Sequence, residues 1–252
     1  MIENKRCKKI LSGKGELKFD VFEDLPVMAA MSVRSDGNMS LEGGEVAAVN
    51  RKKFLKELGV LDFSVRYAEI RHGAGIGVVY HDDPRVGDGI VTDVDGLVTP
   101  CKDVYLSVGA ADCPTVFLYD SEKKIAGLLH AGWRGLSRGI IWNAVWKMRD
   151  LGSDFRDIRA GIGPCVCQKD YEFREEVWTF FGSVPDAITK INCRNYLDLR
   201  KVAVYKLRES GVGRENISVS DVCTYCDKSM FSRRRDGENY GVMMAVFGMM
   251  SD

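Results

Sequence analysis

Histidine is scarce in this chain, and the scarcity narrows the search for catalytic or metal-binding residues. Only three histidines occur among 252 residues, at positions 72, 81 and 130. An excess of charge of either sign is also lacking, because Lys+Arg and Asp+Glu both number 36. No net charge therefore draws the protein toward nucleic acid or an anionic membrane, and we expect neither as a partner.

Long apolar runs and export signals are also missing from the sequence. No stretch approaches the ~18 uninterrupted apolar residues that a membrane-spanning helix needs. Residues 1–19 carry charges throughout and lack the apolar segment of a secretory signal. Eight cysteines without such a signal are typical of cytosolic thiols and possible metal ligands rather than of disulfides. We therefore expect a cytoplasmic protein.

The length and the pattern of apolar residues predict the architecture. A chain of 252 residues can bury a sizeable core, and no linker, repeat or low-complexity segment divides it. Strands are predicted at 27–33, 65–70, 76–80, 88–93, 103–108, 115–119, 125–129, 158–163, 217–222 and 240–250. Helices are predicted at 45–58, 136–151, 172–181 and 198–209. This mixture favours an α+β fold, a single domain over residues 1–252 with layered mixed β-sheets flanked by helices.

The densest chemical signal lies in two motifs, Ala111-Asp-Cys-Pro114 and His130-Ala-Gly-Trp-Arg-Gly135. The apolar run 125–129 is typical of a buried strand, which would deliver His130 onto a turn of small residues. Cys113 lies in the connection between two predicted strands. Side chains at such strand ends are held by a rigid scaffold and can reach a ligand.

His72, Cys113 and His130 together suggest a metal site, since each lies beside or within a glycine-containing turn. Zinc favours imidazole nitrogen and thiolate sulfur, and three protein ligands leave a fourth position open for water or substrate. The same atoms would also serve a Cys-His hydrolase, with His130 as the base and Cys113 as the nucleophile. The third donor, His72, favours the metal.

Charged residues near these motifs could complete the site. Arg134 follows at the expected start of a helix, where a guanidinium suits an oxyanion such as phosphate, although a surface salt bridge is an equal alternative. Asp88 and Asp112 are close enough in sequence to act as proton carriers or as partners of the ligands.

Two further motifs are interpreted without a ligand. Cys165-Val-Cys167 and Cys223-Thr-Tyr-Cys226 could supply four sulfurs to a structural zinc, but this spacing is not that of a zinc ribbon. We interpret these cysteines as small buried residues and turn formers. The basic run Arg233–Arg235 is followed by Asp-Gly, and we interpret it as a turn with a local role.

Taken together, the motifs resemble one family, first described as multicopper polyphenol oxidases or laccases. The same family was later described as purine nucleoside phosphorylases and as peptidoglycan editing factors. The resemblance covers roughly residues 60 to 250, and the motifs appear in the family's order. They are Ala111–Pro114, Leu129–Gly135, Gly161–Cys165, Cys223–Cys226 and Phe231–Gly237.

The resemblance implies a fold distantly similar to that of Cys-His deamidase toxins. It implies a catalytic zinc on His72, Cys113 and His130, with copper as the alternative metal. It also implies phosphorolysis of adenosine, inosine, guanosine and methylthioadenosine, together with adenosine deamination, so that purine nucleosides and phosphate would be the partners. In such a reaction Arg34 and Arg134 would hold anionic oxygens, while Asp88 or Asp112 would handle a proton.

The same residues are also compatible with three other functions. The first is a Cys-His amidase acting on a peptidoglycan-type substrate. The second is a copper-dependent polyphenol oxidase, which one His/Cys/His set disfavours because a true laccase uses several coppers. The third is a structural-zinc binding module, which would need a closed set of four ligands and would not turn over a substrate.

Overall fold

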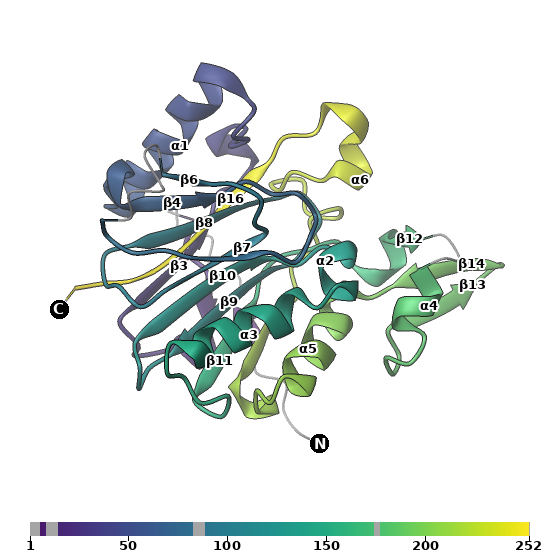
Figure 1. The fold of residues 1–252 in the computed structure, drawn as a ribbon. Coiled ribbons are helices and arrows are strands. Elements are labelled where there is room, and N and C mark those ends of the chain that lie inside the picture. The colour runs from purple at the N-terminus through teal and green to yellow at the C-terminus, as the bar shows by residue number, and fades with distance from the viewer. Residues whose placement is uncertain (1–5, 9–14, 83–88, 174–176, 252) are drawn as a thin grey trace.

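Two β-sheets pack face to face, and helices cover both outer faces, which gives four layers (Figure 1). The computed structural model describes residues 6–8, 15–82, 89–173 and 177–251. The expected α+β fold with layered mixed sheets is confirmed.

Sixteen described strands form three sheets. The eight-stranded sheet has the order β2 (Lys18–Phe19), β1 (Arg6–Lys8), β15 (Ile217–Ser220), β11 (Ile158–Ile162), β9 (Thr115–Asp120), β10 (Ile125–His130), β7 (Gly96–Thr99) and β5 (Ile76–Val78). The five-stranded sheet has the order β3 (Val27–Met31), β16 (Met243–Met249), β8 (Tyr105–Ala110), β4 (Val65–Ala68) and β6 (Ile90–Val91). A small sheet of β12 (Glu172–Phe173), β14 (Arg194–Leu197) and β13 (Ile188–Ile191) projects from the body (Figure 1).

The α-helices in the described part of the chain are α1 (Gly44–Leu58), α2 (Trp133–Ser137), α3 (Ile140–Asp150), α4 (Trp178–Phe181), α5 (Leu199–Glu209) and α6 (Arg233–Asp236). Short 3-10 turns include η2 (Arg34–Asp36) and η4 (Gln168–Asp170). Among the described residues, no helix combines the length and the apolar composition needed to cross a membrane.

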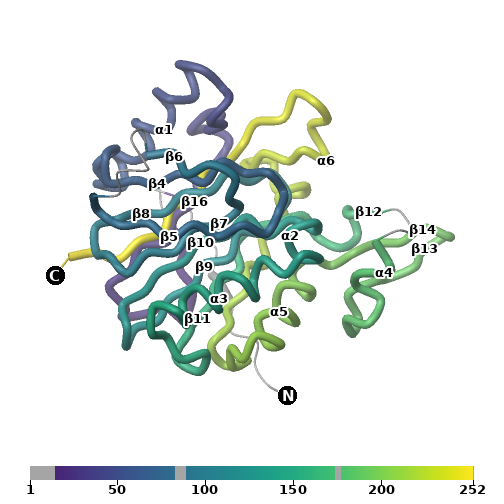
Figure 2. The backbone as a smooth tube through the Cα atoms, viewed as in Figure 1, coloured from purple at the N-terminus to yellow at the C-terminus, as the bar shows by residue number. Residues whose placement is uncertain are grey.

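One core cluster lies between the two large sheets and is built from one face of each. Phe117 of β9 and Phe247 of β16 meet edge to face with ring centroids 5.4 Å apart, and both are fully buried. All six residues of β9 are buried, because both faces of the sheet are covered there, and residues 116–119 accordingly form an apolar run without alternation. Figure 2 shows how β3, near the start of the chain, lies beside β16, near its end.

The outer layers are amphipathic helices. On the eight-stranded sheet, α3 buries Ile141, Val145 and Met148 in a cluster that also includes residues of α5. On the five-stranded sheet, α1 buries Phe54 and Leu55. Each helix therefore hides one apolar stripe and leaves its other face to solvent.

Two predicted helices are confirmed with their ends. The helix expected at 45–58 is α1, which stops at Gly59 because that residue adopts a left-handed conformation with φ of 75°. The helix expected at 198–209 is α5, and Asp198 caps it by accepting hydrogen bonds from the backbone N–H groups of Arg200 and Lys201.

Two other helix predictions are wrong in extent or type. The helix expected at 136–151 is two helices, because Gly139 has a φ of 83° and separates α2 from α3. The helix expected at 172–181 begins instead as β12, which pairs with β14, and only α4 is helical. Apolar residues spaced four apart mimicked a helical period there, and strand pairing overrode it. Of the strand expected at 88–93, β6 forms the centre, and residue 88 lies outside the described residues.

Truncation of the buried aromatic pair tests this core. Phe247→Ala should lower the free energy of unfolding by about 3–5 kcal/mol, because it removes a buried ring and leaves a cavity between the sheets. Urea unfolding measures the change. The matched control is Phe63→Ala, whose side chain is 78% exposed and whose loss should have little effect. Equal destabilisation by both variants would contradict this packing.

Candidate functional site

The connection from β8 to β9 carries Cys113 from the five-stranded sheet to the eight-stranded sheet. The next strand, β10, ends at His130, which lies opposite Thr115 in the register of β9 and β10. Each residue lies at a strand end, as the sequence predicted, and the pairing of β9 with β10 brings the two to the same end of neighbouring strands.

The donor atoms of these two residues face one spot next to Gly132. A Cβ atom built on Gly132 would lie 2.9 Å from Cys113 Sγ and 3.4 Å from His130 Nε2. Any larger residue would therefore press on the sulfur, and glycine leaves the space between the two donors free.

A buried carboxylate places His72 beside this pair. Asp95 accepts hydrogen bonds from the backbone N–H groups of Arg71 (3.1 Å) and Gly73 (2.7 Å), and its own carbonyl accepts one from the His130 N–H (2.8 Å). His72 itself has a φ of 56°, a left-handed conformation that the loop imposes. As a result the two imidazole rings meet edge to face, with centroids 5.2 Å apart. Sequence reasoning missed Asp95, because its role depends on backbone groups distant in the chain.

His130 is held in the form that a metal ligand needs. Its Nδ1 lies 2.7 Å from the carbonyl oxygen of Gly109, to which it donates, so Nε2 carries the lone pair. That Nε2 is buried and makes no hydrogen bond. Burial lowers the pKa of His130 to about 4, so the imidazole is neutral near pH 7. A buried acceptor without a donor is costly, and a bound cation would satisfy it.

Cys113 responds to burial in the opposite direction. Burial, reinforced by Asp112 and Cys165, raises the pKa of its thiol to about 12, although Arg233 and Arg134 act to lower it. Without a cation beside it, Cys113 is therefore a thiol near pH 7. Metal coordination deprotonates such a thiol outright, so the donor set suits a metal better than it suits an empty site.

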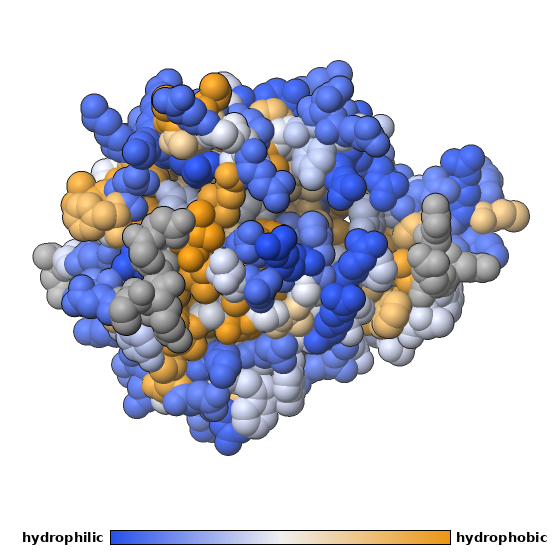
Figure 3. Space-filling view, turned by 45° about the horizontal axis from the view of Figure 1, so that its top comes forward, coloured by the Kyte–Doolittle hydropathy of each residue, from blue (hydrophilic) through white to orange (hydrophobic). Residues whose placement is uncertain are grey.

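His72, Cys113 and His130 line one cavity of about 430 Å³, a size typical of small-molecule sites. The polar part of the lining includes Glu42, Arg51, Glu69, Arg233 and Tyr240. The apolar part includes Met39, Leu41, Ile70, Ile90 and Met244. On the side of the molecule that carries α1 and α6, apolar surface runs between hydrophilic groups (Figure 3).

Arg233 is a functional candidate that the sequence interpretation missed. The run Arg233–Arg235 is not only a turn but the short helix α6, and Arg233 lines the cavity. Its charge, together with that of Arg134, acts to lower the pKa of His72, which desolvation lowers most and Asp95 opposes. The expected local role holds for Arg235, whose guanidinium donates to the carbonyls of Thr224, Tyr225, Asp227 and Met230.

The two arginines predicted to hold anionic oxygens have different surroundings. Arg34 forms an ion pair with Asp236 and lies over the ring of Phe231, and it is not among the residues that line the cavity. Arg134 stacks on Trp133 with its Cζ 4.5 Å from the ring centroid and lines a neighbouring hollow of about 450 Å³. Arg134 lies in the first turn of the short α2 rather than at the start of a helix from residue 136.

The two predicted acids also differ. Asp88 lies outside the described residues. Asp112 is buried, and both its oxygens accept hydrogen bonds, from the Thr224 hydroxyl (2.6 Å) and from the Arg234 N–H (2.7 Å). These contacts give Asp112 a positioning role, and its proton transfer stays a prediction.

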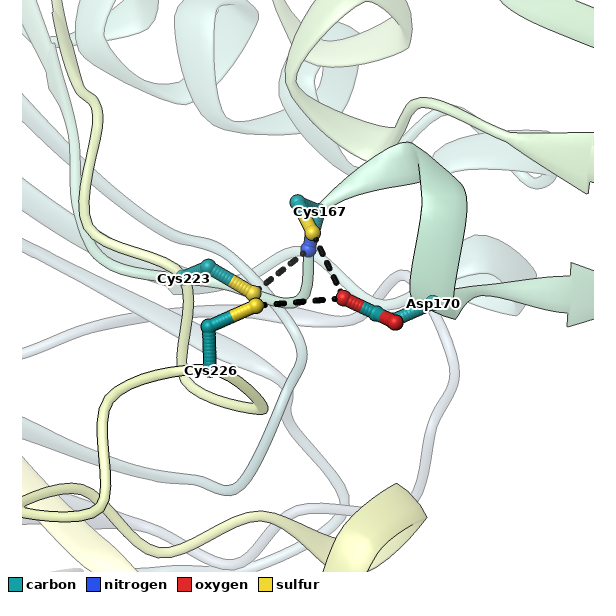
Figure 4. A group of neighbouring side chains, drawn as sticks. All are labelled: Cys167, Asp170, Cys223 and Cys226. Atoms are coloured by element: carbon teal, nitrogen blue, oxygen red, sulfur yellow. Dashed lines mark hydrogen bonds between the residues drawn. The ribbon is translucent and has the colours of Figure 1, made fainter.

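A second donor group lies apart from the cavity lining. The ligand atoms of Cys167, Asp170, Cys223 and Cys226 all lie within 4.8 Å of one another, and they point toward a common centre (Figure 4). This group could hold a metal ion. The prediction that these cysteines are buried is wrong for Cys167, Cys223 and Cys226, because Cys167 and Cys223 are partly exposed and Cys226 is exposed. Cys165 is buried and does not belong to this group. The fourth ligand of the group is the carboxylate of Asp170. Within the described part of the chain, His72, Cys113 and His130 do not form a group of this tightness.

Known proteins resemble this chain over much of its length. A sequence model of the family described as multi-copper polyphenol oxidoreductase laccase matches residues 36–250. A purine nucleoside phosphorylase of Mycobacterium tuberculosis is 35% identical over 201 residues, which cover 77% of this chain and 77% of that protein. The adenosine deaminase RL5, from an unknown prokaryotic organism, is 36% identical over 155 residues, 59% of each chain. The crystal structure of YlmD from Geobacillus stearothermophilus superimposes with a TM-score of 0.88 at 27% identity, covering 98% of this chain and 100% of that chain.

Acidification of metal-free protein tests the burial of His130. The folded state favours the neutral imidazole, so the unfolded chain binds more protons between pH 6.5 and pH 4. The free energy of unfolding should therefore fall as the pH drops through this window, by up to about 3 kcal/mol. Urea unfolding at a series of pH values, with a chelator present, measures the loss. His130→Gln should flatten this pH dependence, whereas His81→Gln, at an exposed position, should leave it unchanged. Equal pH dependence in the unsubstituted protein and both variants would refute the burial of a neutral His130.

Proposed function

Because this chain belongs to the multi-copper polyphenol oxidoreductase laccase family, we propose that it is a zinc-dependent purine nucleoside phosphorylase. It would convert adenosine, inosine, guanosine and methylthioadenosine, with phosphate, to the free base and a sugar 1-phosphate, and it would also deaminate adenosine. The observation that carries the proposal is the buried, unpartnered Nε2 of His130, which faces Cys113 in a cavity that Arg233 also lines. The names of the phosphorylase and deaminase relatives supply the substrate class.

His72, Cys113 and His130 are the residues that would hold the zinc. Two imidazole nitrogens and a sulfur are donors that zinc favours, and three protein ligands leave a position open for catalysis. A zinc ion at this site supplies positive charge for polarising the substrate and for activating the water that deamination needs. Asp95 would fix the His72 loop, and the Gly109 carbonyl would fix the tautomer of His130.

Arg233 and Arg134 are the cations best placed to bind phosphate. Arg233 lines the cavity, and Arg134 lies in the adjoining hollow with Arg234. Both Arg233 and Arg134 act on the same two groups, His72 and Cys113, so their charges converge on the proposed metal site. A guanidinium presents paired N–H donors that match the oxygens of phosphate.

The reaction needs positioning more than it needs covalent catalysis. A phosphate oxygen forms a bond to the anomeric carbon while the bond from that carbon to the purine nitrogen breaks. The purine leaves with the electron pair and gains the proton that the attacking hydrogen phosphate loses, and the sugar carries oxocarbenium character in the transition state. The apolar wall of the cavity would hold the base and exclude water, while the arginines would orient the phosphate.

A Cys-His amidase is the second candidate, since Cys113 Sγ and His130 Nε2 lie beside the same point. Such an enzyme needs a thiolate. The pKa of Cys113 is raised to about 12 and that of His130 is lowered to about 4, so the pair are thiol and neutral imidazole near pH 7. His72 would also have no role. The amidase is therefore the weaker candidate.

Polyphenol oxidation by several coppers is disfavoured by the number of ligands. The chain has three histidines, and only His72 and His130 line the cavity. One His/Cys/His set can bind a single zinc or copper ion, whereas a multicopper enzyme needs several such sets.

The proposal predicts that base release depends on both metal and phosphate. Chelator-stripped protein should release hypoxanthine from inosine only after zinc and phosphate are both restored. His130→Ala should lose cavity zinc and turnover together, whereas His81→Ala should keep both, since His81 is exposed and outside the cavity. Release by stripped protein without zinc would refute the metal's role. Amide hydrolysis without phosphate would favour the amidase.

Arg233 provides a second test. Arg233→Ala should lower kcat/KM for phosphate by about 10- to 100-fold, the effect of losing a charge-assisted hydrogen bond. The helix α6 should stay folded in this variant, because the Ser232 side chain caps its N-terminus. Arg194→Ala is the control, since Arg194 lies on the projecting sheet and pairs with Glu172 on its surface. An unchanged phosphate dependence in Arg233→Ala would remove this residue from the site.

A further inference from the structure

Three cysteines outside the cavity lining, Cys167, Cys223 and Cys226, lie on two hydrogen-bonded turns. Cys167 and Asp170 are the first and fourth residues of one turn, in which the Asp170 N–H donates to the Cys167 carbonyl (3.1 Å). Cys223 and Cys226 occupy a second turn, and there the Asp227 N–H donates to the Cys223 carbonyl (2.9 Å). The sequence thus contains Cys-x-x-Asp and Cys-x-x-Cys, and in each pair two residues separate the ligands, a separation that structural zinc sites use for their cysteine pairs.

Backbone pairing brings the two turns together. Cys165 and Cys223 form an isolated parallel bridge, and the Thr224 N–H donates to the Cys165 carbonyl (3.2 Å). The four ligand atoms then lie within 4.8 Å of one another and face a common centre (Figure 4). Zinc–sulfur bonds of about 2.3 Å in a tetrahedron would set the sulfurs roughly 3.8 Å apart, so a small closure completes the site.

From this convergence we propose that Cys167, Asp170, Cys223 and Cys226 bind one zinc ion as a closed structural site, separate from the catalytic cavity. Three sulfurs and one carboxylate oxygen fill the tetrahedral positions that zinc prefers. The proposal does not depend on the purine reaction, because none of the four residues lines the cavity.

Contacts around the cluster support ligation rather than simple burial. The carboxylate Oδ2 of Asp170 lies 2.9 Å from Cys167 Sγ and 3.2 Å from Cys226 Sγ, so one oxygen already joins two of the sulfurs. The Cys167 N–H donates to Cys223 Sγ (3.2 Å), which is the kind of hydrogen bond that steadies a metal-bound thiolate. Cys226 is exposed, so zinc has a path from solvent.

The site would also have a structural purpose. Arg235 donates to the carbonyls of Thr224, Tyr225 and Asp227 in the second turn, and Asp112 holds the Thr224 hydroxyl. A metal clamping this turn to η4 would therefore stabilise the segment that carries α6. Because ligand binding to the folded state raises its stability, the bound zinc should raise Tm.

Metal content in variants of the full-length chain tests the proposal. In a His130→Ala background, which removes a ligand of the proposed cavity zinc, protein prepared under reducing conditions with zinc should retain about one zinc per chain. Adding Cys226→Ser should abolish that zinc, whereas adding Cys193→Ser, at an exposed cysteine outside the cluster, should leave it. Elemental analysis after removal of free metal gives the ratio.

A second variant guards against misfolding of the cysteine mutant. Asp170→Asn keeps the shape of the side chain and should weaken zinc binding at least 10-fold, measured by competition with a chromophoric chelator. In the His130→Ala background, cobalt loading should give sulfur-to-cobalt charge-transfer absorption from the cysteine cluster, and adding Asp170→Asn should alter it. The proposal is overturned if the His130→Ala protein holds no zinc, if Cys226→Ser keeps it, or if mass spectrometry finds Cys223 and Cys226 joined in a disulfide under these conditions. Loss of inosine turnover alone would bear on the purine reaction and not on this site.

Discussion

A buried carboxylate, that of Asp112, joins the parts of the protein on which the proposed chemistry depends. It accepts hydrogen bonds from the Thr224 hydroxyl and the Arg234 N–H, which come from segments more than a hundred residues away in the chain. A carboxylate removed from water needs such donors, so both segments are fixed against the turn that carries Cys113. The turn of Cys223 and Cys226 and the helix α6 are thus both held to the turn that carries Cys113.

The four-layer fold explains why the cavity forms where it does. The chain crosses from the five-stranded sheet to the eight-stranded sheet between β8 and β9, and Cys113 lies on that crossing. His130 ends the neighbouring strand, and Asp95 ties the His72 loop to it. Burial then keeps Cys113 protonated and His130 neutral, which leaves two uncharged donors facing a space that a cation would fill.

The sequence predicted the elements whose signals are local. The strand run at 125–129 and the helix at 198–209 were predicted from their apolar patterns, and the structure has both as β10 and α5. Local signals failed where backbone geometry or pairing decided the outcome, as at Gly139 and at β12. Within the site, Cys113 and His130 were predicted as site residues because each lies at the end of a predicted strand.

The remaining site residues depend on contacts between distant segments. Asp95 works through backbone N–H groups of a separate loop, and Arg233 reaches the cavity because Asp112 holds the neighbouring residue. Asp170 was missed because only sulfurs were considered as partners of Cys223 and Cys226. Such long-range positions follow from the tertiary structure and leave little trace in residue spacing.

Anomalous diffraction at the zinc edge, from crystals of zinc-loaded protein, tests the central claim most directly. The claim is that the cavity is a metal centre built from His72, Cys113 and His130. A peak bonded to His130 Nε2 and Cys113 Sγ is the predicted result. Zinc density confined to the cysteine turns, with the cavity donors unliganded, would contradict it.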